Sequence, residues 1–401
     1  MAPYAAELPP PLPVKKRKTF INCALLAGLC AALFLLVVAA FAGCFWFFFL
    51  RLSPVPEHTS TSPGEEAPDP RILADTWLSG LHAKAQFNGG VLVAKKGEPI
   101  FLEFYGTADL EGKVPLTRHS AFRLASVSKP FTAMAILRLA ETGDLCLDDP
   151  ITRLLPELPW DEVTIRHLLQ HTGDLPDYLD IPETGFSVET PLTFEDVLHH
   201  LGTQHATFSP RPGREYSYSN TGYVLLATIV QRASQKPFHQ AMNELIFLPL
   251  GMADSQVWHL DCAAPDRSNR VEGFSFGKPA VPGWQDGIAG DGGVFVSLND
   301  FLKWDRALAR GTLISGELWA ESLTPPTLPE GNTSDYGYGW VIEGPDHHWH
   351  NGAWLAAATF VSRFPDEDAL VVVLDNNANG FRVERIAGTL ASLFGLQAEK
   401  Q

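Results

Sequence analysis

Three short motifs with side chains suited to nucleophilic catalysis follow one another along the chain. They are Ser126-Val127-Ser128-Lys129, Tyr218-Ser219-Asn220 and His350-Asn351-Gly352. Together they offer a hydroxyl nucleophile, groups that can take its proton, and backbone that can border an acyl intermediate. Because the motifs are far apart in the sequence, only a folded domain can bring them together. The pattern predicts a serine hydrolase that acts through an acyl-enzyme.

Ser126 and Lys129 have the spacing that places two side chains on one face of a helix. Apolar periodicity predicts a helix over 126–142, ended by Gly143. A serine at a helix N-terminus lies at the positive end of the helix dipole, where backbone N–H groups can stabilise an oxyanion. Its proton can pass to Lys129 if burial lowers the pKa of the lysine. Alternatively, Lys129 stays charged and favours a phenolate at Tyr218 as the acceptor.

A second Ser-x-x-Lys, at residues 275–278, shows how weak this motif is on its own. It contains Gly277 and is followed by Pro279, so no helix is expected to begin there. Residues 273–277 also match a Gly-x-Ser-x-Gly nucleophile elbow, which requires a strand before it and a helix after it. Prolines follow instead, and we therefore do not expect Ser275 to be a nucleophile.

The motifs and their surroundings resemble those of the class C β-lactamase-like serine hydrolases. That family also includes D-alanyl-D-alanine carboxypeptidases, D-aminopeptidases and esterases. The resemblance covers residues 71–395 and is carried, beyond Ser126–Thr132, by Gly143–Pro150, His167–Thr172, Pro212–Tyr223, Pro249–Met252 and Tyr336–Trp340. These segments occur in the order that the family shows.

The resemblance implies a role for each candidate residue. Ser126 would be the nucleophile, Lys129 its partner, and Tyr218 the general base and acid. The substrate would contact Asn220 and a strand edge, while backbone N–H groups would form the oxyanion hole. The strand edge comprises His350, Asn351 and Gly352, and the oxyanion hole comprises the N–H groups of Ser126 and Ala353.

The resemblance also implies the fold, an α/β (α+β) arrangement with an antiparallel sheet flanked by helices. An all-helical lobe would be inserted at roughly residues 143–290. The apolar patterns agree with this fold, because they predict strands near both ends of the body and helices between them. The expected strands are 90–94, 99–105, 356–364 and 369–374, and the expected flanking helices are 72–87 and 381–394.

One departure from the family pattern bears on the substrate. β-Lactamases of this family typically have lysine at the position of His350, and histidine is only partly charged near neutral pH. We therefore favour an ester or a D-amino-acid peptide as substrate over an antibiotic. A penicillin-binding or β-lactamase-type protein, and an acylated sensor that does not turn over, remain alternatives.

Composition excludes some functions. The chain of 401 residues has a formal net charge of −16, and residues 51–401 carry −19 because residues 1–50 contribute +3. Such an acidic body is not expected to bind nucleic acid. No CxxC motif is present, and we expect neither a metal nor a cofactor. Cys146 and Cys262 can pair, but separate thiols are favoured.

Two groups of histidines have spacings that metal ligands can show. For His167 and His171, four residues apart, a structural role is favoured over metal binding. For the cluster at 347, 348 and 350, lining the cleft is favoured.

The N-terminus predicts a membrane anchor. Ile21–Leu50 is a run of 30 residues without a charge, about 45 Å as a helix against a hydrocarbon core of about 30 Å. Lys15–Lys18 should stay cytoplasmic, which leaves the body outside, in the periplasm if the cell is bacterial. A cleaved signal peptide, or lipidation at Cys44, is less favoured. We predict a cytoplasmic tail (1–19), a transmembrane helix (20–50), a Pro/Ser/Thr-rich linker (51–70) and a hydrolase domain (71–401).

Overall fold

The computed structural model describes residues 68–204, 208–262, 269–275, 277–329, 331–377 and 380–396. The predicted cytoplasmic tail, the predicted transmembrane helix and nearly all of the predicted linker lie outside these ranges. Among the described helices, none combines the length and the apolar character needed to cross a membrane.

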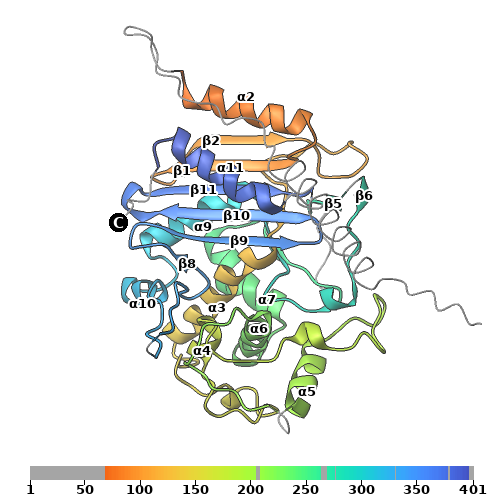
Figure 1. Cartoon of the computed structure of the whole chain (residues 1–401), viewed down its shortest axis with the longest axis vertical. Coiled ribbons are helices and arrows are strands. Elements are labelled where there is room, and N and C mark those ends of the chain that lie inside the picture. Colours follow the sequence, from red (N-terminus) through yellow and green to blue (C-terminus); the bar gives the residue numbers. More distant parts are fainter. Residues whose placement is uncertain are drawn as a thin grey trace, which may run out of the picture. The chain divides into compact units, whose positions relative to one another are not determined.

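A six-stranded antiparallel sheet is built from both ends of the described chain (Figure 1). The strand order is β2-β1-β11-β10-β9-β8. Val91 of β1 lies opposite Val373 of β11, so segments far apart in sequence pair at the centre. All of β11 is buried, as its continuous apolar run indicates. The strands are β1 (Gly89–Lys95), β2 (Glu98–Tyr105), β8 (Val341–Ile342), β9 (His348–Trp354), β10 (Ala357–Phe364) and β11 (Ala369–Asp375).

Helices from the two ends of the domain pack on one face of this sheet. Figure 1 shows α11 (Gly380–Leu393) in front of the central strands and α2 (Pro70–Ala83) beside it. α11 contacts β10 and β11, while α2 contacts β2. The predicted terminal helices and strands are therefore confirmed, with ends shifted by a few residues.

The remaining helices lie mostly below the sheet in Figure 1. They are α3 (Lys129–Glu141), α4 (Ile165–Leu169), α5 (Phe194–Gln204), α6 (Asn220–Ser234), α7 (Phe238–Met242), α8 (Leu248–Leu250), α9 (Leu298–Arg310) and α10 (Gly316–Ser322). Short 3-10 turns are η1 (Ala125–Ser128), η2 (Ile151–Arg153), η3 (Tyr178–Asp180), η5 (Trp284–Gly287) and η6 (Pro365–Glu367), and η4 (Asn243–Phe247) is a π-turn.

The expectation of an all-helical lobe at 143–290 was wrong in one respect. This region contains α4 to α8 but also three two-residue strands, β4 (Gln256–Val257), β5 (Phe274–Ser275) and β6 (Lys278–Pro279). Strands this short show no alternation that a sequence pattern could reveal. Ser275 and Lys278 pair across the β5–β6 hairpin, and no helix begins there, as expected.

α3 lies at the centre of the core and holds Lys129 in place. Ten of its side chains, from Lys129 to Leu139, are buried. Phe131 stacks on Trp304 of α9 with ring centroids 4.2 Å apart and meets the edge of Phe301 at 6.1 Å. Because the interior is close-packed, this contact fixes the start of α3 relative to the sheet.

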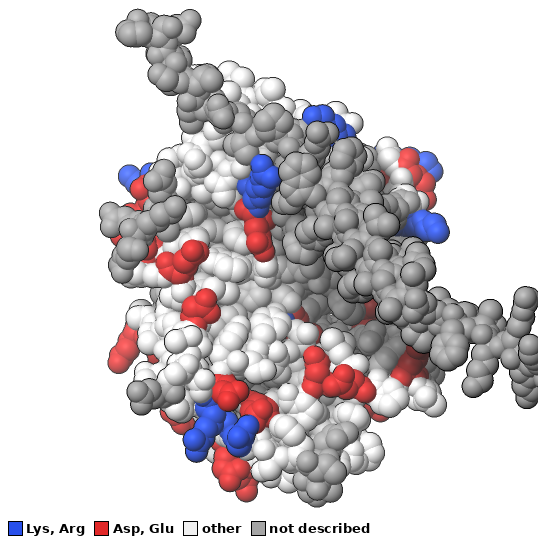
Figure 2. Space-filling model, in the orientation of Figure 1, with Lys and Arg blue, Asp and Glu red and all other residues white. Residues whose placement is uncertain are grey.

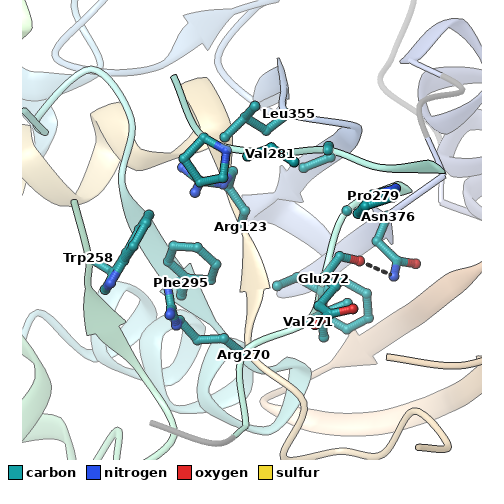
Figure 3. A pocket seen from close by; sticks show the side chains of 15 residues that line it. Arg123, Trp258, Arg270, Val271, Glu272, Pro279, Val281, Phe295, Leu355 and Asn376 are labelled. Atoms are coloured by element: carbon teal, nitrogen blue, oxygen red, sulfur yellow. Dashed lines mark hydrogen bonds between the residues drawn. The ribbon is translucent and has the colours of Figure 1, made fainter. Parts of the chain in front are cut away.

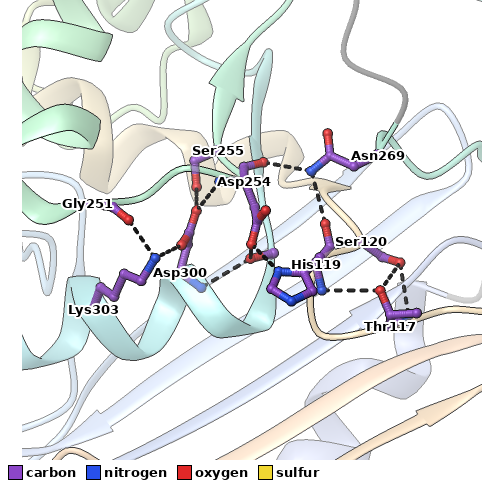
Figure 4. A network of polar contacts seen from close by, with 10 residues as sticks. Thr117, His119, Ser120, Gly251, Asp254, Ser255, Asn269, Asp300 and Lys303 are labelled. Atoms are coloured by element: carbon purple, nitrogen blue, oxygen red, sulfur yellow. Dashed lines mark hydrogen bonds and ion pairs between the residues drawn. The ribbon is translucent and has the colours of Figure 1, made fainter.

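A small sheet, β3-β7-β4, brings three further segments to the same region. It consists of β4 with β3 (Phe122–Arg123) and β7 (Val294–Val296). A polar network at the N-terminus of α9 anchors the segment that enters β4 (Figure 4). The buried Asp300 carboxylate accepts hydrogen bonds from the Ser255 hydroxyl and the Asp254 N–H, both at 2.8 Å, and from Lys303 Nζ at 2.7 Å. Since every partner is a donor, the buried carboxylate is well satisfied.

Candidate active site

The structure brings Ser126 and Lys129 together through a tighter turn than expected. The α-helix begins at Lys129, not Ser126, and Ser126 lies in the 3-10 turn η1. Residues three apart eclipse one another in a 3-10 turn, and Lys129 Nζ donates a hydrogen bond to Ser126 Oγ at 3.2 Å. Ala125, just before the serine, has a φ of +49°. Such left-handed backbone costs on the order of 1–3 kcal/mol in a non-glycine residue and is typical of functional sites.

The Lys129 amine is fully buried and completely hydrogen-bonded. Besides Ser126, its Nζ donates to Asn220 Oδ1 at 2.9 Å and to the backbone carbonyl of Asp291 at 3.1 Å. Burial lowers the pKa of Lys129 to about 8, against the opposing charges of Asp291 and Asp177. A substantial share of this amine is therefore neutral near pH 8 and able to accept a proton.

Tyr218 covers the same amine from the cleft side. Lys129 Nζ lies 4.7 Å from the centroid of its ring. The Tyr218 side chain is 43% exposed, yet desolvation by the surrounding protein raises the pKa of its phenol, and a hydrogen bond with Ser126 only partly offsets this. The phenol therefore stays protonated near neutral pH. Of the two routes that the sequence leaves open, this geometry favours Lys129 as proton acceptor and Tyr218 as a neutral hydroxyl that donates.

His171 positions the loop that carries Tyr218. Its Nδ1 accepts a hydrogen bond from the Ser219 N–H at 3.0 Å, and its ring centroid lies 4.4 Å from that of Tyr218. His167 instead accepts a hydrogen bond from the Thr164 N–H at 3.1 Å, at the start of α4. These partners agree with the structural role favoured for both histidines. The contact between His171 and the tyrosine motif was not predicted.

Strand β9 places its predicted residues on opposite faces. His350 is buried, donates from Nδ1 to the Asn351 carbonyl at 2.6 Å and accepts at Nε2 from the Tyr336 hydroxyl at 2.9 Å. Burial lowers the pKa of His350 to about 3, with the Lys129 charge adding to the effect. The ring is therefore neutral and offers no charge to a substrate.

The Asn351 side chain does not face the cleft. Successive residues of a strand point to opposite faces, and the Asn351 amide donates to Glu384 of α11 at 2.6 Å. Any contact of Asn351 with a substrate would therefore come from its backbone, and its predicted place in the strand edge stays a prediction.

Gly352 lets β9 pass directly beside the nucleophile. A Cβ at this position would lie 2.5 Å from the Leu124 carbonyl and 2.8 Å from the Ser126 backbone nitrogen. The next residue, Ala353, lines the same cleft as Ser126. The strand edge is thus where the motif predicts it, while the oxyanion role of the Ser126 and Ala353 N–H groups stays a prediction.

Sequence reasoning missed two residues of the site, Asp291 and Tyr178. The Asp291 carboxylate accepts a hydrogen bond from the Tyr178 hydroxyl at 3.0 Å. Burial raises the pKa of Asp291, although the Lys129 charge acts in the opposite direction. Asp291 belongs to the segment Gly290-Asp291-Gly292-Gly293, whose composition alone indicates no more than a turn.

The cleft around Ser126 opens beside a larger pocket. The cleft has a volume of about 90 Å³ and is lined by residues that include Asn220, Asp291 and Trp354. The neighbouring pocket has about 480 Å³ and shares Arg123 and Trp258 with the cleft.

Two arginines flank aromatic rings in this larger pocket (Figure 3). Arg270 Cζ lies 4.2 Å from the Trp258 ring centroid and Arg123 Cζ lies 4.8 Å from that of Phe295. The Arg123 guanidinium also lies 3.7 Å from the Asp286 carboxylate. The charge of Arg123 is therefore opposed by a nearby carboxylate, and the pocket walls combine aromatic rings with arginine side chains.

On the face shown in Figure 2, acidic side chains are scattered widely, and basic side chains lie singly or next to acidic ones. This distribution reflects the acidic composition of the body.

Comparisons with known proteins show the family of this chain. The β-lactamase family model matches residues 74–393. The chain is 33% identical over 331 residues to penicillin-binding protein 4* of Bacillus subtilis, covering 77% of this chain and 72% of that protein. It is 35% identical over 181 residues to esterase EstB of Burkholderia gladioli, covering 41% of this chain and 45% of the esterase.

A solved structure shows the same fold. The penicillin-binding protein from Bacillus halodurans superposes with a TM-score of 0.67 at 26% identity, covering 80% of this chain and 99% of that one. The chain belongs to the β-lactamase family of serine hydrolases.

Proposed function

We propose that this hydrolase is an esterase that works through an acyl-enzyme on Ser126. The observation that carries the proposal is the hydrogen-bonded trio of Ser126, Lys129 and Asn220, in which the lysine has a pKa of about 8. An amine near its pKa at the working pH is an effective proton acceptor.

In the proposed reaction these residues act one after another. Neutral Lys129 takes the Ser126 proton as the oxygen attacks the ester carbonyl, and the N–H groups of Ser126 and Ala353 hold the oxyanion. The Tyr218 hydroxyl gives its proton to the leaving alkoxide and regains one from Lys129. Water, deprotonated along the same route, then attacks the acyl-enzyme carbonyl and releases the acid.

A neutral substrate fits the charges around the cleft. His350 is neutral, and Arg123 faces Asp286, so neither is an unopposed cation for a substrate carboxylate. The likeness to the Burkholderia gladioli esterase supports the same choice. The pocket of about 480 Å³ next to the cleft has aromatic and apolar side chains besides Arg123 and Arg270, and these suit the acyl or alcohol part of an ester.

We further propose that residues 20–50 anchor the enzyme in a membrane, with the hydrolase domain outside the cytoplasm. The support is the uncharged apolar run of 30 residues that follows Lys15–Lys18. Protease treatment of sealed cells tests this topology. Loss of the domain from intact cells is the expected result, and a domain protected until the cells are lysed would contradict it.

Hydrolysis by the full chain should be compared on a short-chain p-nitrophenyl ester, a D-alanine p-nitroanilide and a chromogenic cephalosporin. We expect turnover of the ester and its loss in Ser126→Ala. Ser275→Ala, in the second Ser-x-x-Lys, is the matched control and should keep full activity. Turnover of the anilide alone would make the protein a peptidase. Cephalosporin turnover would make it a β-lactamase, and acylation without release would make it a sensor.

A further inference from the structure

Three potential metal ligands converge outside the catalytic cleft. They are His239 of α7, His259 just after β4, and Cys262 in the loop that follows. One ligand atom from each lies within 4.8 Å of the others. None of the three lines the cleft around Ser126, so the cluster is separate from the proposed catalytic chemistry.

His259 makes the outer hydrogen bond that metal-binding histidines usually make. Its ring is buried, and Nδ1 lies 2.8 Å from the Gly287 carbonyl oxygen. A carbonyl can only accept, so Nδ1 carries the hydrogen and Nε2 presents its lone pair. A backbone carbonyl on the second ring nitrogen is the outer contact that fixes the tautomer and raises the basicity of a ligating histidine.

The other two side chains of the cluster, His239 and Cys262, are partly buried. Among the described residues no disulfide involves Cys262, whose Sγ lies 3.9 Å from the Val257 carbonyl.

We propose that His239, His259 and Cys262 bind one zinc ion. Two imidazole nitrogens and a thiolate sulfur form a donor set that zinc favours. Metal–ligand bonds of about 2.0–2.3 Å in a tetrahedron place ligand atoms roughly 3.3–3.8 Å apart. An ion would therefore draw the three side chains together by about 1 Å, which rotation about their side-chain bonds can supply. Water completes the coordination.

The proposed ion would add a direct link between elements that are distant in the sequence. It would connect α7 to the loop after β4, and through His259 it would reach the Gly287 carbonyl of η5. The same turn carries Asp286, which faces Arg123 at the cleft. Because the folded state alone assembles the site, binding should raise stability in proportion to the logarithm of the zinc concentration. The sequence did not suggest this site, because its ligands follow no CxxC or HxxxH spacing.

The test uses the full chain, stripped with a chelator and then titrated with zinc chloride. We expect one zinc per chain to remain after gel filtration, together with a raised thermal midpoint. Cys262→Ser and His259→Ala should each weaken zinc binding at least tenfold. Cys146→Ser and His199→Ala replace exposed residues of the same types elsewhere, and should bind as the unaltered protein does.

Cobalt chloride gives a second readout that does not depend on how the variants fold. Cobalt bound through a thiolate should give a sulfur-to-metal charge-transfer absorption in the unaltered protein and in Cys146→Ser, but not in Cys262→Ser. Absence of both retained zinc and this absorption in the unaltered protein would overturn the proposal. So would zinc binding that Cys262→Ser and His259→Ala leave unchanged.

Discussion

The Nδ1 atom of His171 accepts a hydrogen bond from the backbone N–H of Ser219 at 3.0 Å, one residue after Tyr218. This contact ties the tyrosine motif to the turn that follows α4 and sets where the Tyr218 hydroxyl lies. We expect His171→Ala to lower ester kcat/KM by about 10- to 100-fold, because displacing a reacting group by about 1 Å has effects of that order. His167→Ala is the matched control and should change kcat/KM by less than about threefold. Equal losses in both variants would show that His171 has no special part in positioning Tyr218.

The proposed role of Lys129 predicts how activity depends on pH. Below a pKa of about 8 the amine is protonated and cannot accept the Ser126 proton, so kcat/KM should rise with pH through an apparent pKa of about 8. Lys129→Arg should lose at least about 100-fold, because a guanidinium keeps its proton in this range. Stopped-flow acylation by the p-nitrophenyl ester measures both effects. A profile that is flat from pH 6 to pH 9 would rule out Lys129 as the acceptor.

Tyr218→Phe separates the hydroxyl from the ring that covers Lys129. The phenylalanine keeps the ring over the amine, so stability should change little. Loss of the proton donor should lower kcat by about 10²- to 10⁴-fold. Tyr216→Phe removes a hydroxyl from the neighbouring ring and should retain activity. If Tyr218→Phe turned over the ester normally, the proton would reach the leaving group by another path.

The parts of this site that the sequence predicted are those held in local motifs. The Ser126 and Lys129 pair follows from a three-residue spacing, and Asn220 follows from the motif at the start of α6. The opposite directions of the His350 and Asn351 side chains could also have been predicted, because side chains alternate along a strand. They were not, because the motif resemblance assigned both residues to the same strand edge.

Other features depended on long-range packing and left no local pattern. Asp291 reaches Lys129 because β7 pairs with β3, and those strands are only three and two residues long. Ala125 takes a left-handed backbone conformation that its residue type does not suggest. The neutral state of His350 follows from burial and from Tyr336, which the strand pattern cannot reveal.

Gly352→Ala tests the close approach of β9 to the nucleophile. The added methyl group would meet the Leu124 carbonyl at 2.5 Å and the Ser126 nitrogen at 2.8 Å, so backbone has to move. We expect a loss of at least about 100-fold in kcat/KM and of about 1–3 kcal/mol in the free energy of unfolding. Gly388→Ala in α11 is the control, since nothing lies within 4 Å of the added atom. It should keep activity and gain roughly 0.5–1 kcal/mol.

A buried ion pair joins Arg363 of β10 to Asp305 of α9. Removing it measures how much this contact between sheet and helix contributes to stability. Arg363 Nε donates to Asp305 Oδ1 at 2.6 Å, and the two residues are 4% and 1% exposed. Removing one partner leaves the other charge buried and unpaired. Arg363→Met should therefore lower the free energy of unfolding by about 3–5 kcal/mol, as measured with urea. The double variant Arg363→Met with Asp305→Leu should recover most of that loss, because no charge is then left without a partner.

An exposed ion pair provides the comparison. Lys236 and Glu244 pair on the surface with side chains 43% and 49% exposed. Lys236→Met should therefore cost no more than about 1 kcal/mol. A loss at Arg363→Met as small as that at Lys236→Met would mean that water reaches the remaining Asp305 carboxylate or that it takes up a proton, because either removes the cost of an unpaired buried charge. A double variant no more stable than Arg363→Met would instead show that packing of the arginine stem, and not its charge, joins β10 to α9.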